Sequence, residues 1–108
     1  MGVSAKGRRT ITYKEQKYIW WVAPYEDDCD RIYLRILSED KSIILRYRVG
    51  DGSFIVVSEG RLFQGQKQTG TAKLYRLPME EPIDVVTPKI VAKLIEWAVY
   101  GRNAVSIR

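Results

Sequence analysis

The chain has 108 residues, enough for one domain but too few for a catalytic domain with a separate regulatory one. Hydrophobic residues make up 45% and charged residues 29%, proportions that exclude a wholly disordered or collagen-like chain. There is no histidine and a single cysteine, Cys29, which excludes histidine-based catalysis, an intrachain disulfide and a multi-cysteine metal cluster. We therefore expect no enzymatic activity, no cofactor and no metal site.

The charge balance favours an anionic partner. Lys and Arg total 18 against 13 Asp and Glu, a net charge of +5 that is still ordinary for a small domain. The first ten residues lack the apolar run of a signal peptide, and no stretch approaches the roughly 20 apolar residues of a membrane span. The expectation is a cytoplasmic protein without membrane association, with a mobile N-terminal segment at residues 1–9 and a single domain over residues 10–108.

Residues 10–77 alternate between β-branched or aromatic runs and short polar turns, a pattern typical of antiparallel strands. Pro24 is expected to end the second strand, because proline cannot donate to a β-ladder, and residues 25–30 to form an acidic loop. Short connections make consecutive strands antiparallel neighbours. The predicted strands are residues 10–13, 17–22, 31–37, 42–49, 54–57 and 71–77.

A helix is predicted at the C-terminal end of the chain. Thr87 is a typical N-cap, Pro88 suits the first helical position, and Gly101 is a natural residue just after the last turn. The helix therefore runs to about Tyr100. The predicted fold is α+β: an antiparallel meander of five to six strands with this one helix packed on it.

The predicted helix is unusually apolar around its circumference. At 100° per residue its polar side chains fall within about 60°, and the apolar ones spread over roughly 220°, against a stripe of about 100° on an ordinary surface helix. Two interpretations remain open. A curved sheet or the segment 79–86 covers the additional apolar surface, or another protein chain does.

Strand alternation predicts a basic, aromatic patch. If the turn at residues 38–41 pairs the two strands around it, their second faces come together. That face carries Tyr33, Arg35, Arg46 and Arg48, an arrangement that suits nucleic acid, with guanidinium on phosphate and ring on base. The alternative is a solvated outer face that uses arginine stems as its cover.

Three tryptophans are candidate protein-interface residues. Trp20 and Trp21 are adjacent, so in a strand they face opposite sides, and only one of them belongs to the core. The pattern does not say which one. Trp97 lies on the apolar side of the predicted helix.

The sequence carries no catalytic motif. The acidic run at 26–30 lacks the glycine of a calcium loop, and the segment 65–70 lacks the ending of a phosphate-binding loop. The first functional hypothesis is a non-enzymatic interaction module whose partner is a protein, including a second copy of the chain. The alternative is a nucleic-acid-binding sheet module that uses the basic face.

Overall fold

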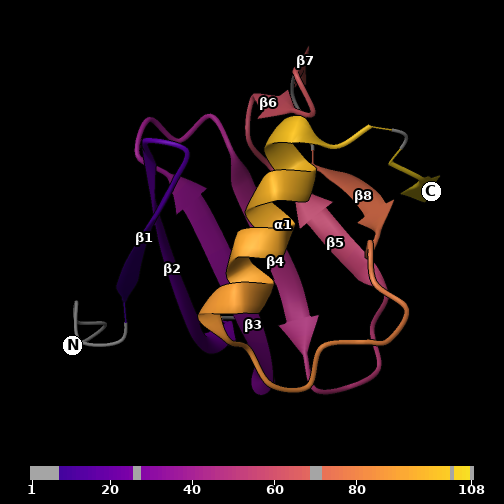
Figure 1. Ribbon diagram of the computed structural model, residues 1–108. Helices are drawn as coiled ribbons and strands as arrows, with labels where there is room; N and C mark the ends of the chain where they lie inside the picture. The colour runs from indigo at the N-terminus through magenta and orange to yellow at the C-terminus, as the bar shows by residue number, and fades with distance from the viewer. Residues whose placement is uncertain (1–7, 26–27, 69–71, 103, 108) are drawn as a thin grey trace.

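The computed structural model of the chain describes residues 8–25, 28–68, 72–102 and 104–107. A seven-stranded antiparallel sheet, in the order β1-β2-β3-β4-β5-β8-β9, is crossed on one face by the helix α1, Pro88–Tyr100 (Figure 1). The strands are β1 (Arg9–Tyr13), β2 (Gln16–Tyr25), β3 (Asp28–Ser38), β4 (Ile44–Val49), β5 (Ile55–Ser58), β8 (Lys73–Arg76) and β9 (Ser106–Ile107); β6 (Leu62–Phe63) and β7 (Gln66–Lys67) form a separate small hairpin. The predicted α+β architecture is confirmed, with slightly more strands than expected.

The hairpin of β2 and β3 is longer than the sequence predicted. β2 continues through Pro24, which pairs with Ile32, and β3 begins at Asp28, so Pro24 does not end the strand and residues 25 and 28–30 are not loop. Residues 26 and 27 lie outside the described part of the chain. Proline is tolerated here because, within the described residues, β1 pairs with β2 only as far as Trp20, and no described strand pairs with Pro24 on that edge.

The small strands at the far edge were not predicted. After α1 the chain returns to the sheet, and Ser106–Ile107 pairs with β8, a run too short to carry a strand pattern. The segment 61–70, between the predicted fifth and sixth strands, was expected to be a loop, but it contains the β6–β7 hairpin, whose turn places Gly65 at φ 77°. Residues 69–71 of the predicted sixth strand and its preceding loop lie outside the described residues.

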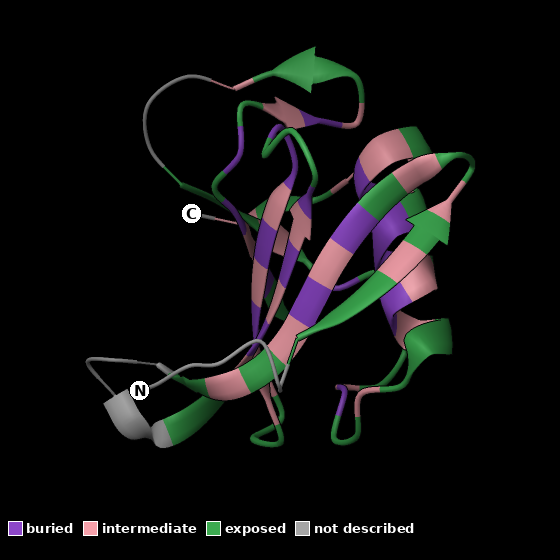
Figure 2. Cartoon of the chain, turned by 90° about the vertical axis from the view of Figure 1, so that its left-hand side faces the viewer, coloured by how far each residue is buried: buried purple, intermediate pink, exposed green. Residues whose placement is uncertain are grey.

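The core lies between α1 and one face of the sheet. Buried and partly exposed positions alternate along the strands (Figure 2), as expected for a sheet with one covered face. The helix contributes four fully buried side chains, and the strands meet them mainly from β2 to β5. These residues are Val91, Leu94, Ile95 and Ala98 of the helix with Tyr18, Trp20, Leu34, Ile36, Leu45, Tyr47 and Val56 of the sheet.

The wide apolar surface of α1 is covered by the same chain. Its exposed stripe is the predicted one, Lys89, Lys93, Glu96 and Tyr100. The sheet curls so that β1 flanks the helix, and Phe63 of β6 packs against Trp97 on its other side. The segment before the helix adds buried Ile83 and partly buried Met79 and Val86. Of the two interpretations of the apolar helix, the intramolecular one therefore describes this fold.

The two ends of α1 lie where the sequence predicted them, but the backbone conformation at the C-terminal end differs from the expected one. The amide of Ile90 donates to Oγ1 of Thr87 (3.2 Å), which is the predicted N-cap. Gly101 has an ordinary extended backbone (φ −70°, ψ 171°) rather than the left-handed one expected after a helix. Glycine is needed for space instead, because a Cβ there would lie 2.5 Å from the carbonyl oxygen of Trp97 and 2.7 Å from Nε2 of Gln64.

Candidate nucleic-acid interface

The sheet face opposite α1 gathers the predicted basic patch. Tyr33 pairs with Arg48 and Arg35 with Arg46 across β3 and β4, so all four side chains lie on the same face, as the alternation predicted. Each of the four is half-buried. The neighbours that face the helix in the middle of these strands are buried, namely Leu34, Ile36, Leu45 and Tyr47. We call the arginine face the set Arg8, Trp21, Arg31, Tyr33, Arg35, Arg46 and Arg48.

Trp21 belongs to this face, and Trp20 to the core. Trp21 pairs with Arg35 across β2 and β3, while Trp20 pairs with Ile36 and is only 6% exposed. The guanidinium of Arg8 lies 4.3 Å from the centre of a Trp21 ring, and that of Arg35 lies 5.9 Å from it. Both distances are within cation–π range, so the indole is held between two cations.

A second ring on the arginine face has the same kind of neighbour. The guanidinium of Arg46 lies 5.8 Å from the ring of Tyr33. Tyr33, Arg46 and Arg48 also border a shallow hollow of about 180 Å³ on this face, whose other border comes from β5 and the turn before it. Aromatic and cationic groups therefore alternate over the central strands.

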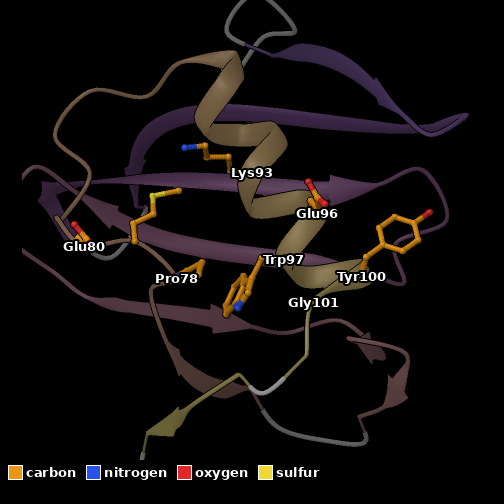
Figure 3. Close-up of a pocket in the computed structure, with 8 residues that line it drawn as sticks. Pro78, Glu80, Lys93, Glu96, Trp97, Tyr100 and Gly101 are labelled. Atoms are coloured by element: carbon orange, nitrogen blue, oxygen red, sulfur yellow. The ribbon is translucent and has the colours of Figure 1, made fainter.

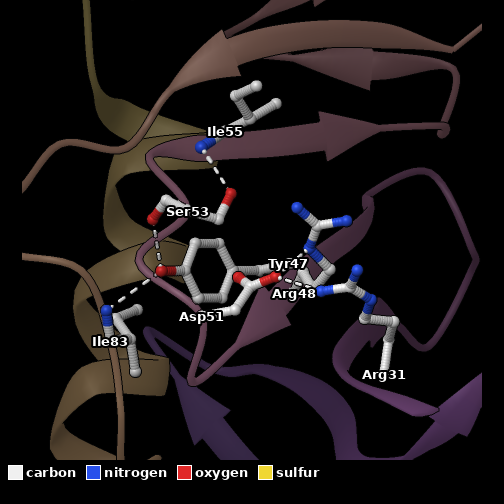
Figure 4. A network of polar contacts seen from close by, with 7 residues as sticks. All are labelled: Arg31, Tyr47, Arg48, Asp51, Ser53, Ile55 and Ile83. Atoms are coloured by element: carbon white, nitrogen blue, oxygen red, sulfur yellow. Dashed lines mark hydrogen bonds and ion pairs between the residues drawn. The ribbon is translucent and has the colours of Figure 1, made fainter.

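Two carboxylates partly neutralise the arginines. Glu59 lies between Arg35 and Arg46, 3.8 and 3.7 Å from their nitrogens. Asp51 lies 3.0 Å from Arg31 and 2.6 Å from Arg48 (Figure 4). Four of the five guanidinium groups thus share two carboxylates, so these seven residues together with Asp51 and Glu59 carry more positive than negative charge.

Beneath the face, Tyr47 anchors the turn that carries Asp51. Its hydroxyl donates to the carbonyl oxygen of Ser53 (2.6 Å) and accepts from the amide of Ile83 (3.0 Å), as Figure 4 shows. Burial raises the pKa of Tyr47 above its usual value of 10.0, so the phenol stays neutral and remains a donor. Gly50 also donates to the carbonyl of Ile83 (3.1 Å), which ties this turn to the segment before α1.

The three candidate interface tryptophans lie in three different surroundings. Trp20 is in the core, with the guanidinium of Arg9 5.7 Å from its ring. Trp97 meets Phe63 edge-to-face, with ring centres 5.0 Å apart, and only its outer side is accessible. The structure therefore does not bring Trp20, Trp21 and Trp97 together as one surface.

The outer side of Trp97 borders an open groove of about 530 Å³ between α1 and the segment 78–80 (Figure 3). Lys93, Glu96, Trp97 and Tyr100 follow one another along its helical border. Glu80 faces them from the other segment, so the groove mixes both signs of charge and does not offer a cationic track to a phosphate chain.

Sequence reasoning missed four residues of this site. Arg31 shares the strand parity of Tyr33 and Arg35, so alternation alone could have assigned it. Arg8 falls in the segment expected to be mobile, although β1 begins at Arg9 and places Arg8 over Trp21. Asp51 and Glu59 follow strands in turns, where alternation gives no direction for a side chain.

Within the part of the chain that the structure describes, no three or more Cys, Asp or Glu side chains are positioned to hold a metal ion. Nor does any described helix have the length and apolar character needed to cross a membrane.

Comparison with known proteins identified no matching family model, no similar curated protein and no similar solved structure.

Proposed function

We propose that the chain is a non-enzymatic binding module whose arginine face binds single-stranded nucleic acid. The observation that supports this function best is the alternation of rings and guanidinium groups on the sheet face opposite α1. Trp21 and Tyr33 supply planar surfaces, and five arginines supply phosphate contacts. Sequence-tolerant proteins of this kind combine a cationic track with aromatic rings on which bases stack.

The strand geometry suits a single strand. Trp21 pairs with Arg35 and Ala23 pairs with Tyr33, so the two rings are diagonal neighbours on β2 and β3. Diagonal positions of an antiparallel pair lie roughly 7–8 Å apart, which places the rings within reach of neighbouring nucleotides. A base stacked on an aromatic ring contributes about 1–3 kcal/mol.

The carboxylates set the strength of this binding. A phosphate that approaches Arg35 and Arg46 competes with Glu59, and one that approaches Arg48 competes with Asp51. Each exposed ion pair is worth at most about 1 kcal/mol, so the exchange is feasible and the net affinity modest. Binding should therefore be strongest at low salt and fall steeply as salt is added.

A triple substitution tests the proposal. Replacing Arg35, Arg46 and Arg48 with Gln keeps most of each stem and removes three charges. We expect weaker binding of labelled single strands in fluorescence anisotropy, and a log–log salt slope smaller by about 2 units. The matched control replaces Arg61, Lys89 and Lys93, three exposed cations outside the arginine face, with Gln. Equal losses in both triples, or no binding by the wild-type protein at about 50 mM salt, would contradict the proposal.

Tryptophan fluorescence gives an independent test. Trp20 is buried and Trp97 lies on the helix side of the sheet, so Trp21 is the one tryptophan of the arginine face. We expect a single strand to quench the wild-type emission, and Trp21→Phe to remove most of that quenching. Quenching that survives in Trp21→Phe would assign the binding to another surface.

A protein partner is the second candidate function, and a different observation favours it. The β2–β3 hairpin extends beyond α1, so Val22 and Ile32, which share the core-side parity, stay 38% and 46% exposed. Pro24 pairs with Ile32 and extends the same apolar end. A partner protein, including a second copy of the chain, could cover it. Light scattering tests whether a second copy of the chain covers this end. A wild-type mass above that of the monomer, which returns to the monomer mass in Ile32→Ser, supports self-association. A strictly monomeric wild-type protein excludes it.

A further inference from the structure

We propose that a polar pocket on the helix side of the sheet binds a small ligand that carries a phosphate group. This pocket is a hollow of about 420 Å³, within the size range of small-molecule sites. Three cations line it, Lys67, Lys73 and Arg102, together with Tyr75, Gln64 and Gln68. This site is independent of the arginine face.

The strand register places the pocket away from the arginine face. Lys73 pairs with Ser58 and Tyr75 pairs with Val56, and both partners are buried on the helix side of β5. The side chains of Lys73 and Tyr75 therefore rise on that same side of the sheet. β7 adds Lys67, and the segment that follows α1 adds Arg102.

The wall of the pocket is fixed by aromatic packing. Tyr75 stacks on buried Phe63, with ring centres 4.1 Å apart and 14° between the ring planes. Trp97 meets both rings at their edges. A rigid wall of this kind holds the Tyr75 hydroxyl in one place, which lowers the entropic cost of binding.

Two glutamines are fixed by hydrogen bonds on either side of this wall. Gln64 donates to the carbonyl of Trp97 (3.0 Å) and accepts from the amide of Ala104 (3.4 Å). Gln68 accepts from the hydroxyl of Ser58 (2.8 Å) and donates to the hydroxyl of Tyr75 (3.2 Å). Because the Tyr75 oxygen already accepts this bond, its own proton can still be donated to a ligand.

The charge of the pocket has one sign. No Asp or Glu is among the described residues that line it, and within the described chain no carboxylate forms an ion pair with Lys67, Lys73 or Arg102. On the arginine face, by contrast, Asp51 and Glu59 already form ion pairs with the arginines.

The donors match a phosphomonoester. Such a group carries about −1.5 to −2 charges at pH 7 and three strong acceptor oxygens. Arg102 offers a planar fork for two of these oxygens, and the lysines offer compact point charges. The volume leaves room for more than a phosphate ion, and the glutamine-rich lining favours a polar remainder such as a sugar.

Calorimetric titration with ribose 5-phosphate, inorganic phosphate and ribose, at constant ionic strength, tests the site. We expect ribose 5-phosphate to bind and ribose alone not to bind. If inorganic phosphate binds as tightly as ribose 5-phosphate, the ligand is the free anion. If inorganic phosphate binds more weakly than ribose 5-phosphate, the ligand is the phosphate ester. If neither phosphate compound binds at about 10 mM, the proposal is wrong.

Variants locate the binding. Lys67→Gln, Lys73→Gln and Arg102→Gln together should weaken ribose 5-phosphate binding by more than about 30-fold, since each charged hydrogen bond carries part of the affinity. Tyr75→Phe keeps the stack on Phe63 and removes only the hydroxyl, so we expect a loss of about fivefold. The control Arg35→Gln, Arg46→Gln and Arg48→Gln should leave this binding unchanged. If that control abolishes the binding and the pocket triple does not, the phosphate group is held by the arginine face and the pocket proposal fails.

Discussion

Tyr47 joins the turn that follows its own strand to the segment before α1. The residue is 2% exposed, and its hydroxyl lies between the carbonyl of Ser53 and the amide of Ile83. One phenol thus satisfies two backbone groups at the bottom of the sheet and fixes the turn that holds Asp51 against the arginines (Figure 4).

Tyr47→Phe should therefore destabilise the fold more than the loss of one oxygen would suggest. The substitution keeps the ring but leaves a buried donor and acceptor without their partner, which costs about 1–3 kcal/mol. Urea unfolding measures the change, and Tyr100→Phe on the exposed stripe of α1 is the control. Equal midpoints for Tyr47→Phe and wild type would mean that water replaces the hydroxyl.

Asp40 is the other residue with a well-defined polar role. Its carboxylate accepts from the amide of Ser42 (3.0 Å), the hydroxyl of Ser42 (2.7 Å) and the hydroxyl of Ser38 (2.8 Å). These bonds favour the charged form and lower the pKa of Asp40 from 3.8 to about 2. They close the turn between β3 and β4, the strands that carry most of the arginine face.

The lowered pKa gives a pH-dependent prediction. Because the folded protein binds the Asp40 proton less readily than the unfolded chain does, the stabilisation is complete above the unfolded value of 3.8 and disappears as pH falls toward about 2. Wild type should therefore melt above Asp40→Asn at pH 7, and the two melting temperatures should converge near pH 2. Asp84→Asn, on an exposed carboxylate, is the control. A constant difference over this pH range would contradict the assignment.

At the scale of elements, α1 holds the sheet together from one side. Leu94 and Ile95 are 1% and 0% exposed, and they meet the buried side chains of the strands. Leu94→Ala should cost about 2–5 kcal/mol, because the removed atoms leave a cavity in a closely packed core. Lys93→Ala, its exposed neighbour, should change stability by no more than about 0.5 kcal/mol in the same denaturant series. A wild-type midpoint for Leu94→Ala would show that the helix is not docked in this way.

The elements predicted correctly from the sequence are those whose bounds are set by residues within the same segment. The bounds of α1 follow from Thr87, Pro88 and the change of period, all within one segment. The prediction that Pro24 ends its strand was wrong. Whether proline is tolerated there depends on where β1 stops pairing with β2, and the local sequence around Pro24 does not show this. β9 could not be predicted, because two residues carry no period and their pairing with β8 depends on the path after the helix.

The same distinction explains which parts of the two sites could be predicted. Tyr33, Arg35, Arg46 and Arg48 lie on one hairpin, so alternation and a single turn were enough to assemble them. The polar pocket joins β7, β8 and the segment after α1, which only tertiary packing brings together. The sequence could not show which of Trp20 and Trp21 is buried. The two side chains point to opposite faces of the sheet, and the answer depends on which face α1 covers.

At the scale of the whole molecule, the carboxylates of the arginine face give the sharpest prediction. If Glu59 and Asp51 compete with phosphates, Glu59→Gln with Asp51→Asn should raise the affinity for single strands by about tenfold, since each exposed pair is worth at most about 1 kcal/mol. Glu80→Gln with Asp84→Asn removes the same charge elsewhere and should raise it much less, because separated charges are screened by salt.

A double-mutant cycle then assigns the effect to its pairs. In a background of Arg35→Gln and Arg46→Gln, the gain from Glu59→Gln should disappear, because the cations that Glu59 neutralises are gone. The Asp51→Asn gain should survive there, since its partners Arg31 and Arg48 are intact. If Glu59→Gln instead lowers the affinity in the wild-type background, the carboxylate positions the guanidinium groups for phosphate rather than competing with it.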